Sequence, residues 1–158
     1  MLVGEAPGSE EVRKGKPFVG RAGQFLEKQL LPLAGLERSG IRISNTLLHR
    51  PPNNRDPFPE EIEACRPWLQ LQLEMVDPKL VVLLGRFAIK AVLGIEAPMK
   101  ELNGCFVRQH GRLYMLSMHP AAVLHQPSNR GLLLESFSGL GKVLAAKGSG
   151  AVVSSPGS

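Results

Sequence analysis

Cysteine, aromatic residues and long apolar runs are scarce in this sequence. Only two of its 158 residues are cysteines, Cys65 and Cys105, so no disulfide framework is indicated and a reduced intracellular setting is the simplest inference. No apolar run approaches the roughly 20 residues that a membrane-spanning helix needs. The first residues lack the basic stretch followed by an apolar one that marks a signal peptide. These absences predict a soluble protein of the cytoplasm without membrane contact.

Positive charge, in contrast, is in excess. The formal net charge is +5 and the sequence pI is about 9.6. This balance favours a polyanionic partner, with nucleic acid as the first candidate, although many basic proteins bind none. The length and the 43% hydrophobic content fit one domain that buries a core without disulfides or metals.

Apolar patterns alternate between strand-like and helix-like along the chain. Short β-rich runs predict strands at 1–4, 41–48 and 79–84, and a hairpin or a strand pair split by His110-Gly111 at 105–108 and 112–118. Helical spacing predicts helices at 22–34, from 56–60 to Pro78, at 86–93 and at 130–147. A long polar loop is expected over 9–20 and a proline-rich irregular segment over 49–59. This order predicts a three-layer α/β/α sandwich with a mostly parallel central sheet of about four strands.

The domain is expected to span 1–147, followed by a disordered Gly/Ser-rich tail over 148–158.

Four side chains at predicted strand ends or in the adjoining loops are candidates for chemistry. Glu5 follows the first strand and is either a solvated carboxylate or a general base held by the next turn. Phe18 is either a buried packing residue or a stacking platform for a nucleobase. Asn45 offers a donor and an acceptor together, as reading a base edge requires, or merely closes a turn. His119 either caps a helix or stabilises a developing anion. Because carboxyl ends of parallel strands share one edge of a sheet, the stretches 1–20 and 117–124 are expected to face one pocket.

Three ordered motifs combine these residues. They are GEAPGSEEVRKGKPFVGRAGQFL at the start, SNTLLHRPPNNRDPFPEEIEACRPWL in the middle and HPAAVL near the end. In this combination the chain resembles the uracil-DNA glycosylase superfamily, closest to its family 4, the thermostable iron–sulfur type. The likeness runs from Gly4 to about Leu140, nearly the whole structured chain.

The resemblance implies a base-flipping DNA repair enzyme that hydrolyses the N-glycosidic bond of uracil and leaves an abasic site. Phe18 would stack on the flipped ring, Asn45 would bind its N3/O4 edge, and His119 would stabilise the departing uracilate. Glu5 and Glu11 would position or activate water.

Further assignments follow from the same resemblance. The implied substrate-binding positions also include Gly4, Ala6 and Asn54. Leu124, or its neighbour Val123, would wedge into the duplex gap left by the flipped nucleotide. Lys16 and Arg130 are implied phosphate contacts. The implied partner is uracil-containing DNA, and we expect a monomer.

The chain departs from the family at the cluster cysteines. Family 4 members hold a [4Fe-4S] cluster with four cysteines, two of them in a CxxC ahead of the first strand. Here Cys65 matches one ligand position, His49 stands at another, and Cys105 lies in the wrong region. Either a segment ahead of Met1 is missing and His49 is an unusual ligand, or the cluster has been lost. We favour the second alternative and expect no metal and no cofactor in this chain. Val12 also stands where the family usually has an acid.

Two other functions remain open at the level of sequence. One is a catalytically weak glycosylase-like module that recognises DNA without cleaving it. The other is a glycosylase for another deaminated base, such as hypoxanthine. The four residues Glu5, Phe18, Asn45 and His119 favour a uracil-DNA glycosylase over the first of these.

Overall fold

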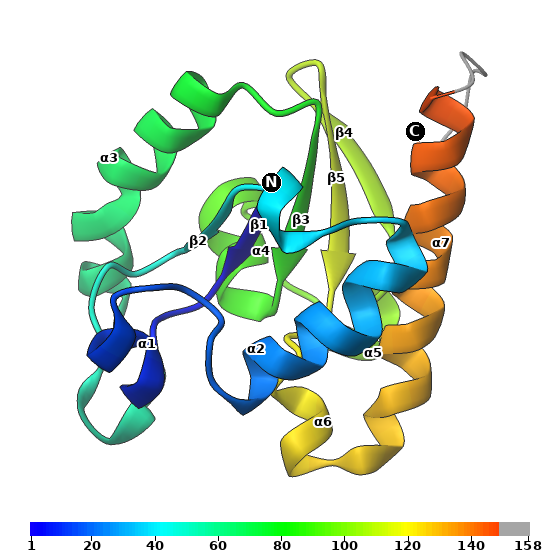
Figure 1. The fold of residues 1–158 in the computed structure, drawn as a ribbon. Coiled ribbons are helices and arrows are strands. Elements are labelled where there is room, and N and C mark those ends of the chain that lie inside the picture. The colour runs from blue at the N-terminus through cyan, green and yellow to red at the C-terminus, as the bar shows by residue number, and fades with distance from the viewer. Residues whose placement is uncertain (149–158) are drawn as a thin grey trace.

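A five-stranded sheet lies at the centre of the molecule, with helices against both of its faces (Figure 1). The computed structural model describes residues 1–148. Within that range no helix is long and apolar enough to cross a lipid bilayer. The elements in chain order are β1 (Leu2–Gly4), α1 (Ser9–Lys14), α2 (Arg21–Phe25), η1 (Leu26–Leu30), η2 (Leu31–Ala34), η3 (Arg38–Gly40), β2 (Ile43–Asn45), η4 (Pro52–Asn54), α3 (Pro59–Val76), β3 (Leu80–Leu84), α4 (Arg86–Leu93), α5 (Met99–Leu102), β4 (Phe106–Gln109), β5 (Arg112–Ser117), α6 (Ala122–His125), η5 (Pro127–Asn129) and α7 (Arg130–Gly148).

The strands follow the order β2-β1-β3-β5-β4. The first four are parallel to their neighbours, and β4 runs antiparallel to β5 at one edge. The mostly parallel sheet is confirmed. It has five strands in the described residues rather than about four, because both halves of the predicted hairpin join it. His110 and Gly111, with φ of 50° and 75°, make the two-residue turn between those halves.

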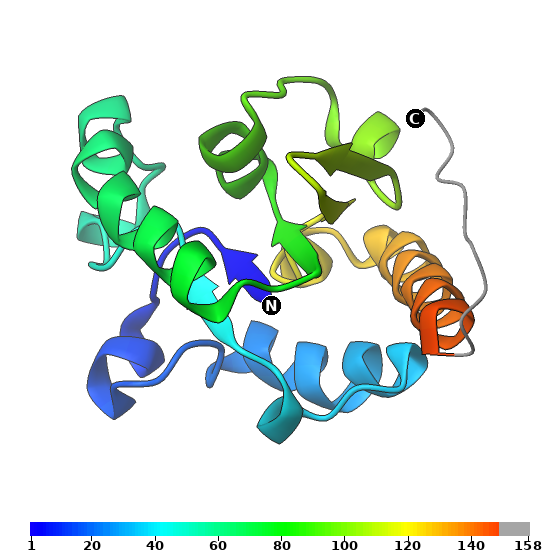
Figure 2. The same cartoon turned by 90° about the horizontal axis from the view of Figure 1, so that it is seen from above.

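Both faces of the sheet are covered because side chains alternate between them along each strand. In β3, Val82 and Leu84 pack with α7 and the helical run over 21–34, whereas Val81 and Leu83 pack with α3 and α4. Seen from above, the two helical layers lie on opposite sides of the sheet (Figure 2). The predicted three-layer sandwich is confirmed.

The segment 9–20, expected to be a polar loop, begins with the helix α1. Two acidic residues lie in the first turn of α1 and two basic residues in its last turn, and both placements favour the helix dipole. Gly15 ends α1 with a left-handed φ of 69°. No residue of α1 is buried, so there is no apolar periodicity from which to predict it.

The helix predicted over 22–34 is present but changes its winding twice. α2 continues into the π-helical turn η1 and then into the 3₁₀ turn η2. Gly35 ends the run in the left-handed conformation, as its position predicts. The tail expected over 148–158 lies, apart from Gly148 at the end of α7, outside the described residues.

The carboxyl ends of the four parallel strands meet at one edge of the sheet. Glu5 follows β1, Asn45 ends β2, and His119 lies two residues after β5. Gly85, directly after β3, donates its N–H to the carbonyl of Ser117 at 2.8 Å and so ties two strand ends together. The chain passes from β1 to β2 on one side and returns to β3 on the other. Ligands of open α/β sheets bind at such a reversal.

Substitutions at two glycines of α7 would show how closely this helix packs on the neighbouring η2. A Cβ at Gly141 would lie 2.5 Å from the carbonyl oxygen of Leu33, whereas a Cβ at Gly139 would meet nothing within 4 Å. We expect Gly141→Ala to destabilise the protein by about 1–3 kcal/mol through overpacking. Gly139→Ala should instead stabilise it by up to about 1 kcal/mol through helix propensity. Urea unfolding of both variants measures the difference, and equal effects would contradict this packing.

Candidate functional site

A cavity of about 1190 Å³ opens at the carboxyl edge of the sheet. It brings the two stretches 1–20 and 117–124 together, as the sequence predicts. Eight of the residues singled out from the sequence line it: Glu5, Ala6, Glu11, Phe18, Asn45, Asn54, His119 and Leu124.

Phe18 forms an aromatic wall of this cavity together with His119. Its side chain is 5% exposed, and the two rings stack with centroids 5.3 Å apart and an interplanar angle of 23°. Gly4 lies behind this wall. A Cβ there would come within 2.6 Å of the Phe18 ring and 2.7 Å of Asn45 Oδ1. The absence of a side chain at Gly4 is therefore what lets Phe18 and Asn45 approach each other.

Glu11 fixes the loop that carries Phe18. Its Oε1 accepts the N–H of Gly8 at 3.0 Å, and its Oε2 accepts those of Val19 at 2.8 Å and Gly20 at 2.6 Å. A carboxylate that accepts several backbone N–H groups is a strong local anchor. The geometry thus gives Glu11 a part in ordering the wall, and its water-activating role stays a prediction.

The backbone of Phe18 itself is left-handed, with φ of 52°. This conformation is costly for a bulky residue and persists only where the surroundings hold it. Arg38 donates hydrogen bonds to the carbonyl of Phe18, at 2.7 Å, and to that of Pro17. Gly23 packs against the same peptide, since a Cβ there would fall 2.0 Å from Phe18 C and O. Phe18 is therefore held from two sides.

Asn45 lines the cavity and carries an unused hydrogen-bond acceptor. Its Oδ1 is buried and has no hydrogen-bond partner within the described residues. A buried acceptor without a partner costs about 1–3 kcal/mol. A ligand that brings an N–H group to this oxygen would remove that cost, so the geometry selects for a donor.

His119 carries a neutral ring with a defined tautomer. Its Nδ1 accepts the backbone N–H of Ala121 at 3.0 Å, so the ring proton resides on Nε2. Burial of the ring lowers its pKa to about 4, and the nearby Glu11 carboxylate only partly opposes this shift. At neutral pH the Nε2–H is thus a hydrogen-bond donor without a charge.

Glu5 lies in a mixed electrostatic environment at the mouth of the cavity. Burial and the nearby Asp56 carboxylate raise its pKa above the ordinary value, and the Arg86 guanidinium opposes them. Arg86 and Asp56 form an ion pair of 2.8 Å with each other. Both also line the cavity. Glu5 therefore sits where a carboxylate holds its proton more readily than in water.

The implied DNA contacts divide into two groups. Leu124 lines the cavity and is 41% exposed, whereas Val123 packs against the core. Of the two alternatives for a wedge, the geometry favours Leu124. Lys16 is exposed and Arg130 contacts Gln29 at 3.3 Å, and neither lines the cavity.

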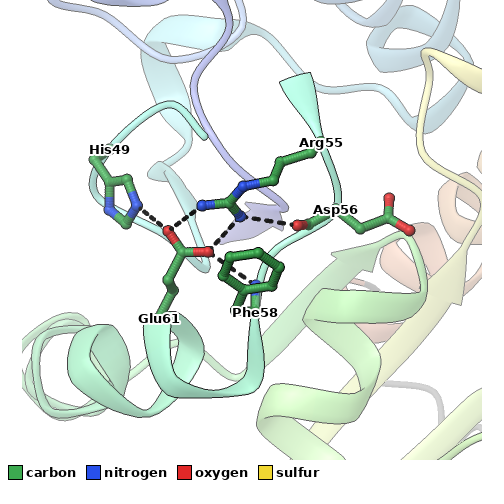
Figure 3. Close-up of polar contacts among 5 residues, drawn as sticks. All are labelled: His49, Arg55, Asp56, Phe58 and Glu61. Carbon is green, nitrogen blue, oxygen red and sulfur yellow. Dashed lines mark hydrogen bonds and ion pairs between the residues drawn. The ribbon is translucent and has the colours of Figure 1, made fainter. Parts of the chain in front are cut away.

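The two residues at cluster-ligand positions are occupied by other contacts. Cys65 is buried in an apolar cluster with Leu47, Ile62 and Ala91. His49 Nε2 lies 2.6 Å from a carboxylate oxygen of Glu61 (Figure 3). No group of three or more His, Cys, Asp or Glu residues suited to a metal occurs among residues 1–148. The described residues alone therefore do not fit a four-iron cluster.

Three residues at the site escaped the sequence analysis: Arg38, Asp56 and Arg86. Arg86 follows β3 by two residues, so the strand-end rule that selected Glu5 could also have selected it. Arg38 acts through contacts to a loop 20 and 21 residues away, for which the sequence holds no local signal.

The raised pKa of Glu5 predicts that its ionisation lowers the free energy of unfolding, and that this loss depends on pH. The native state holds this proton more tightly than the unfolded chain, so ionisation weakens the fold above the raised pKa. We expect Glu5→Gln to raise Tm by a few degrees at pH 7, with a gain that vanishes near pH 3, where Glu5 is protonated in both states. Glu10→Gln is the control, because its pairing with Arg13 lowers the Glu10 pKa. A Tm gain for Glu10→Gln, or none for Glu5→Gln, would contradict the assignment.

The lowered pKa of His119 is open to direct measurement. Because burial disfavours the imidazolium, we expect NMR titration to give this ring a midpoint near 4. The signal is assigned by its loss in His119→Gln. A midpoint at the ordinary value near 6.5 would show that the ring is solvated.

Comparison with known proteins agrees with this geometry. The chain matches the family model described as the uracil DNA glycosylase superfamily over residues 1–138. It is 39% identical over 148 residues to the type-4 uracil-DNA glycosylase of Sulfurisphaera tokodaii, covering 87% of this chain and 66% of the relative. With the type-4 enzyme of Archaeoglobus fulgidus it shares 38% identity over 159 residues, covering 93% and 77% of the two chains.

The type-4 uracil-DNA glycosylase of Thermotoga maritima is 38% identical over 141 residues, covering 87% of this chain and 73% of the relative. The chain thus spans about two thirds to three quarters of the length of these relatives. The range matched by the family model, 1–138, contains the residues of the aromatic wall and its supports. The chain belongs to the uracil-DNA glycosylase superfamily.

Proposed function

We propose that this protein is a monofunctional uracil-DNA glycosylase. A uracil nucleotide turns out of the DNA stack into the cavity, its N-glycosidic bond is hydrolysed, and an abasic site remains in the strand. The observation that carries the proposal is the unpaired Oδ1 of Asn45, a residue that lines the same cavity as Phe18.

Asn45 and Phe18 supply recognition. The Phe18 ring offers a face on which a flat base stacks. Asn45 Oδ1 accepts the N3–H of uracil. Cytosine has a lone pair at N3 instead of a hydrogen, so it would leave the buried oxygen unpaired and repelled. The same unpaired acceptor that costs free energy in the empty cavity thus provides selectivity.

His119 stabilises the leaving group. As the bond between C1′ and N1 breaks, its electron pair passes to the base and spreads onto O2. The neutral Nε2–H donates to that oxygen, and the lowered pKa keeps the ring in this donor form at neutral pH. A fixed donor aimed at developing negative charge is typically worth 10²–10³ in rate.

Glu5 directs the water. The deoxyribose carries positive charge at C1′ once the bond has broken, and a water adds there while its proton passes to the Glu5 carboxylate. Glu11 supports this step by holding the loop beside it. Ala6 and Asn54 complete the lining of the cavity.

Contacts to the duplex lie around the rim. Leu124, exposed on α6, fills the gap that the turned-out nucleotide leaves. Lys16 and Arg130 bind phosphates, in keeping with the net charge of +5. The protein acts as a monomer in the cytoplasm without a [4Fe-4S] cluster. Gel filtration tests the first of these points, and iron analysis of the purified protein tests the cluster.

The assay is base release from oligonucleotides that contain one uracil or one hypoxanthine, as single and double strands, followed by alkali cleavage at the abasic site. We expect uracil release by the wild type and at least a 100-fold loss of rate in Asn45→Ala and His119→Ala, because each removes a partner of the reacting base. DNA affinity, measured by fluorescence anisotropy, should change less than about threefold, since phosphate contacts dominate it.

Gln70→Ala, at an exposed amide on α3 that does not line the cavity, is the control and should leave rate and affinity unchanged. Absence of cleavage on every substrate would rule out the enzyme and favour a DNA-binding module. Equal loss of rate and affinity in the two cavity variants would show that Asn45 and His119 are structural.

A further inference from the structure

One carboxylate outside the cavity contacts both ends of the proline-rich segment 49–58 (Figure 3). Glu61, on the first turn of α3, lies 2.6 Å from His49 Nε2 through one oxygen and 2.6 Å from Arg55 Nη1 through the other. It also accepts the backbone N–H of Phe58 at 2.9 Å. The segment between these contacts is therefore closed into a loop by a single side chain.

This loop adopts a shape that needs support. Asn53 and Asn54 have φ of 56° and 55°, so two consecutive residues lie in the left-handed region. Asparagine tolerates this conformation better than most residues but does not favour it. Arg50 Nε donates to Asn54 Oδ1 at 2.8 Å, which fixes the side chain within the loop. An unsupported chain would relax toward other conformations.

The loop forms one wall of the cavity. Pro51, Asn53, Asn54, Arg55 and Asp56 all line it, whereas His49 and Glu61 do not. The loop is thus fixed by two residues that lie outside the cavity lining.

Arg55 connects Glu61 to the residues that line the cavity. Its guanidinium donates a hydrogen bond to Glu61 and another to the carbonyl of Asp56 at 3.1 Å. It packs 3.8 Å above the Phe58 ring as well, and these contacts limit its movement.

The Glu61 carboxylate keeps its charge under all ordinary conditions. Its hydrogen bonds to Arg55, Phe58 and His49, in that order of size, lower its pKa to about 2. The side chain is only 18% exposed, so water competes weakly for its oxygens.

We propose that Glu61 is a positioning residue for the substrate cavity, and that its contacts with His49 and Arg55 close the 49–58 loop. The proposal rests on the function proposed above. It also accounts for His49, which stands where the resembled family has a cluster cysteine. In this chain the ring nitrogen of His49 binds a carboxylate, and the loop is closed by charge and hydrogen bonds.

A positioning role predicts a particular kinetic pattern. If the loop is ordered only a fraction of the time, substrate binds only that fraction, and KM rises by its inverse while kcat at saturation is retained. Loss of folded protein gives the opposite pattern, a lower apparent kcat with unchanged KM. The two effects are therefore separable in one set of measurements.

The test compares Glu61→Gln with Glu63→Gln. Glu63 lies half a turn further along α3 and pairs with Arg66 at 2.6 Å. The Glu63→Gln substitution therefore removes a similar ion pair but no contact with the loop. We expect Glu61→Gln to raise KM for a uracil oligonucleotide about tenfold with kcat within about threefold. Amide hydrogen exchange over 49–58 should quicken, and exchange in β3 should not. Glu63→Gln should match the wild type in every respect.

His49→Ala provides a second, milder variant that keeps the Arg55 contact, and we expect a KM rise of about threefold with faster exchange near residue 49. The iron content of the purified wild type and of His49→Ala is measured in parallel. Iron bound by the wild type and lost in His49→Ala would overturn the proposal, because His49 would then be a metal ligand. Identical KM and exchange in Glu61→Gln and Glu63→Gln would overturn it too.

Failure of the proposed function is distinguishable from failure of this inference. A wild type that releases no base refutes the glycosylase function. The exchange comparison between Glu61→Gln and Glu63→Gln still decides whether Glu61 holds the loop.

Discussion

The cavity depends on the backbone of one aromatic residue. Phe18 has φ of 52°, and its ring lies against His119 and close to Gly4. The Glu11 carboxylate, the Arg38 guanidinium and the close approach of Gly23 together hold it there. Strained backbone of this kind occurs where function requires a fixed geometry. The strand ends form one side of the cavity, and the contacts that fix Phe18 form its aromatic wall.

A glutamate carboxylate that accepts several hydrogen bonds fixes each of the two loops that line the cavity. Glu11 and Glu61 are each the third residue of a helix, and each accepts the N–H of the residue that precedes the helix, Gly8 or Phe58. This arrangement ordinarily caps a helix. Here the remaining oxygen of each carboxylate reaches a neighbouring segment and fixes it. Each carboxylate thereby ties the start of its helix to a second segment of the chain.

Much of this architecture follows from patterns local to the chain. The nearly continuous apolar run in 79–84 predicts the buried strand, and Gly35 predicts the end of a helix. The strand ends at Glu5, Asn45 and His119 predict the edge of the sheet, because each of these signals depends on near neighbours. The helix α1 has no buried residue and therefore no periodic signal. Contacts such as Arg38 with the Phe18 carbonyl join residues brought close only by the fold. Long-range polar contacts of this sort have no counterpart in spacing or composition.

The way in which the 49–58 loop is closed has a consequence for the conditions under which this cavity keeps its shape. A thiolate that ligates iron loses its hold when the metal centre is oxidised, and redox state then enters the geometry of the site. The carboxylate of Glu61, the imidazole of His49 and the guanidinium of Arg55 exchange no electrons. The hold of these three side chains on the loop therefore does not itself vary with redox state.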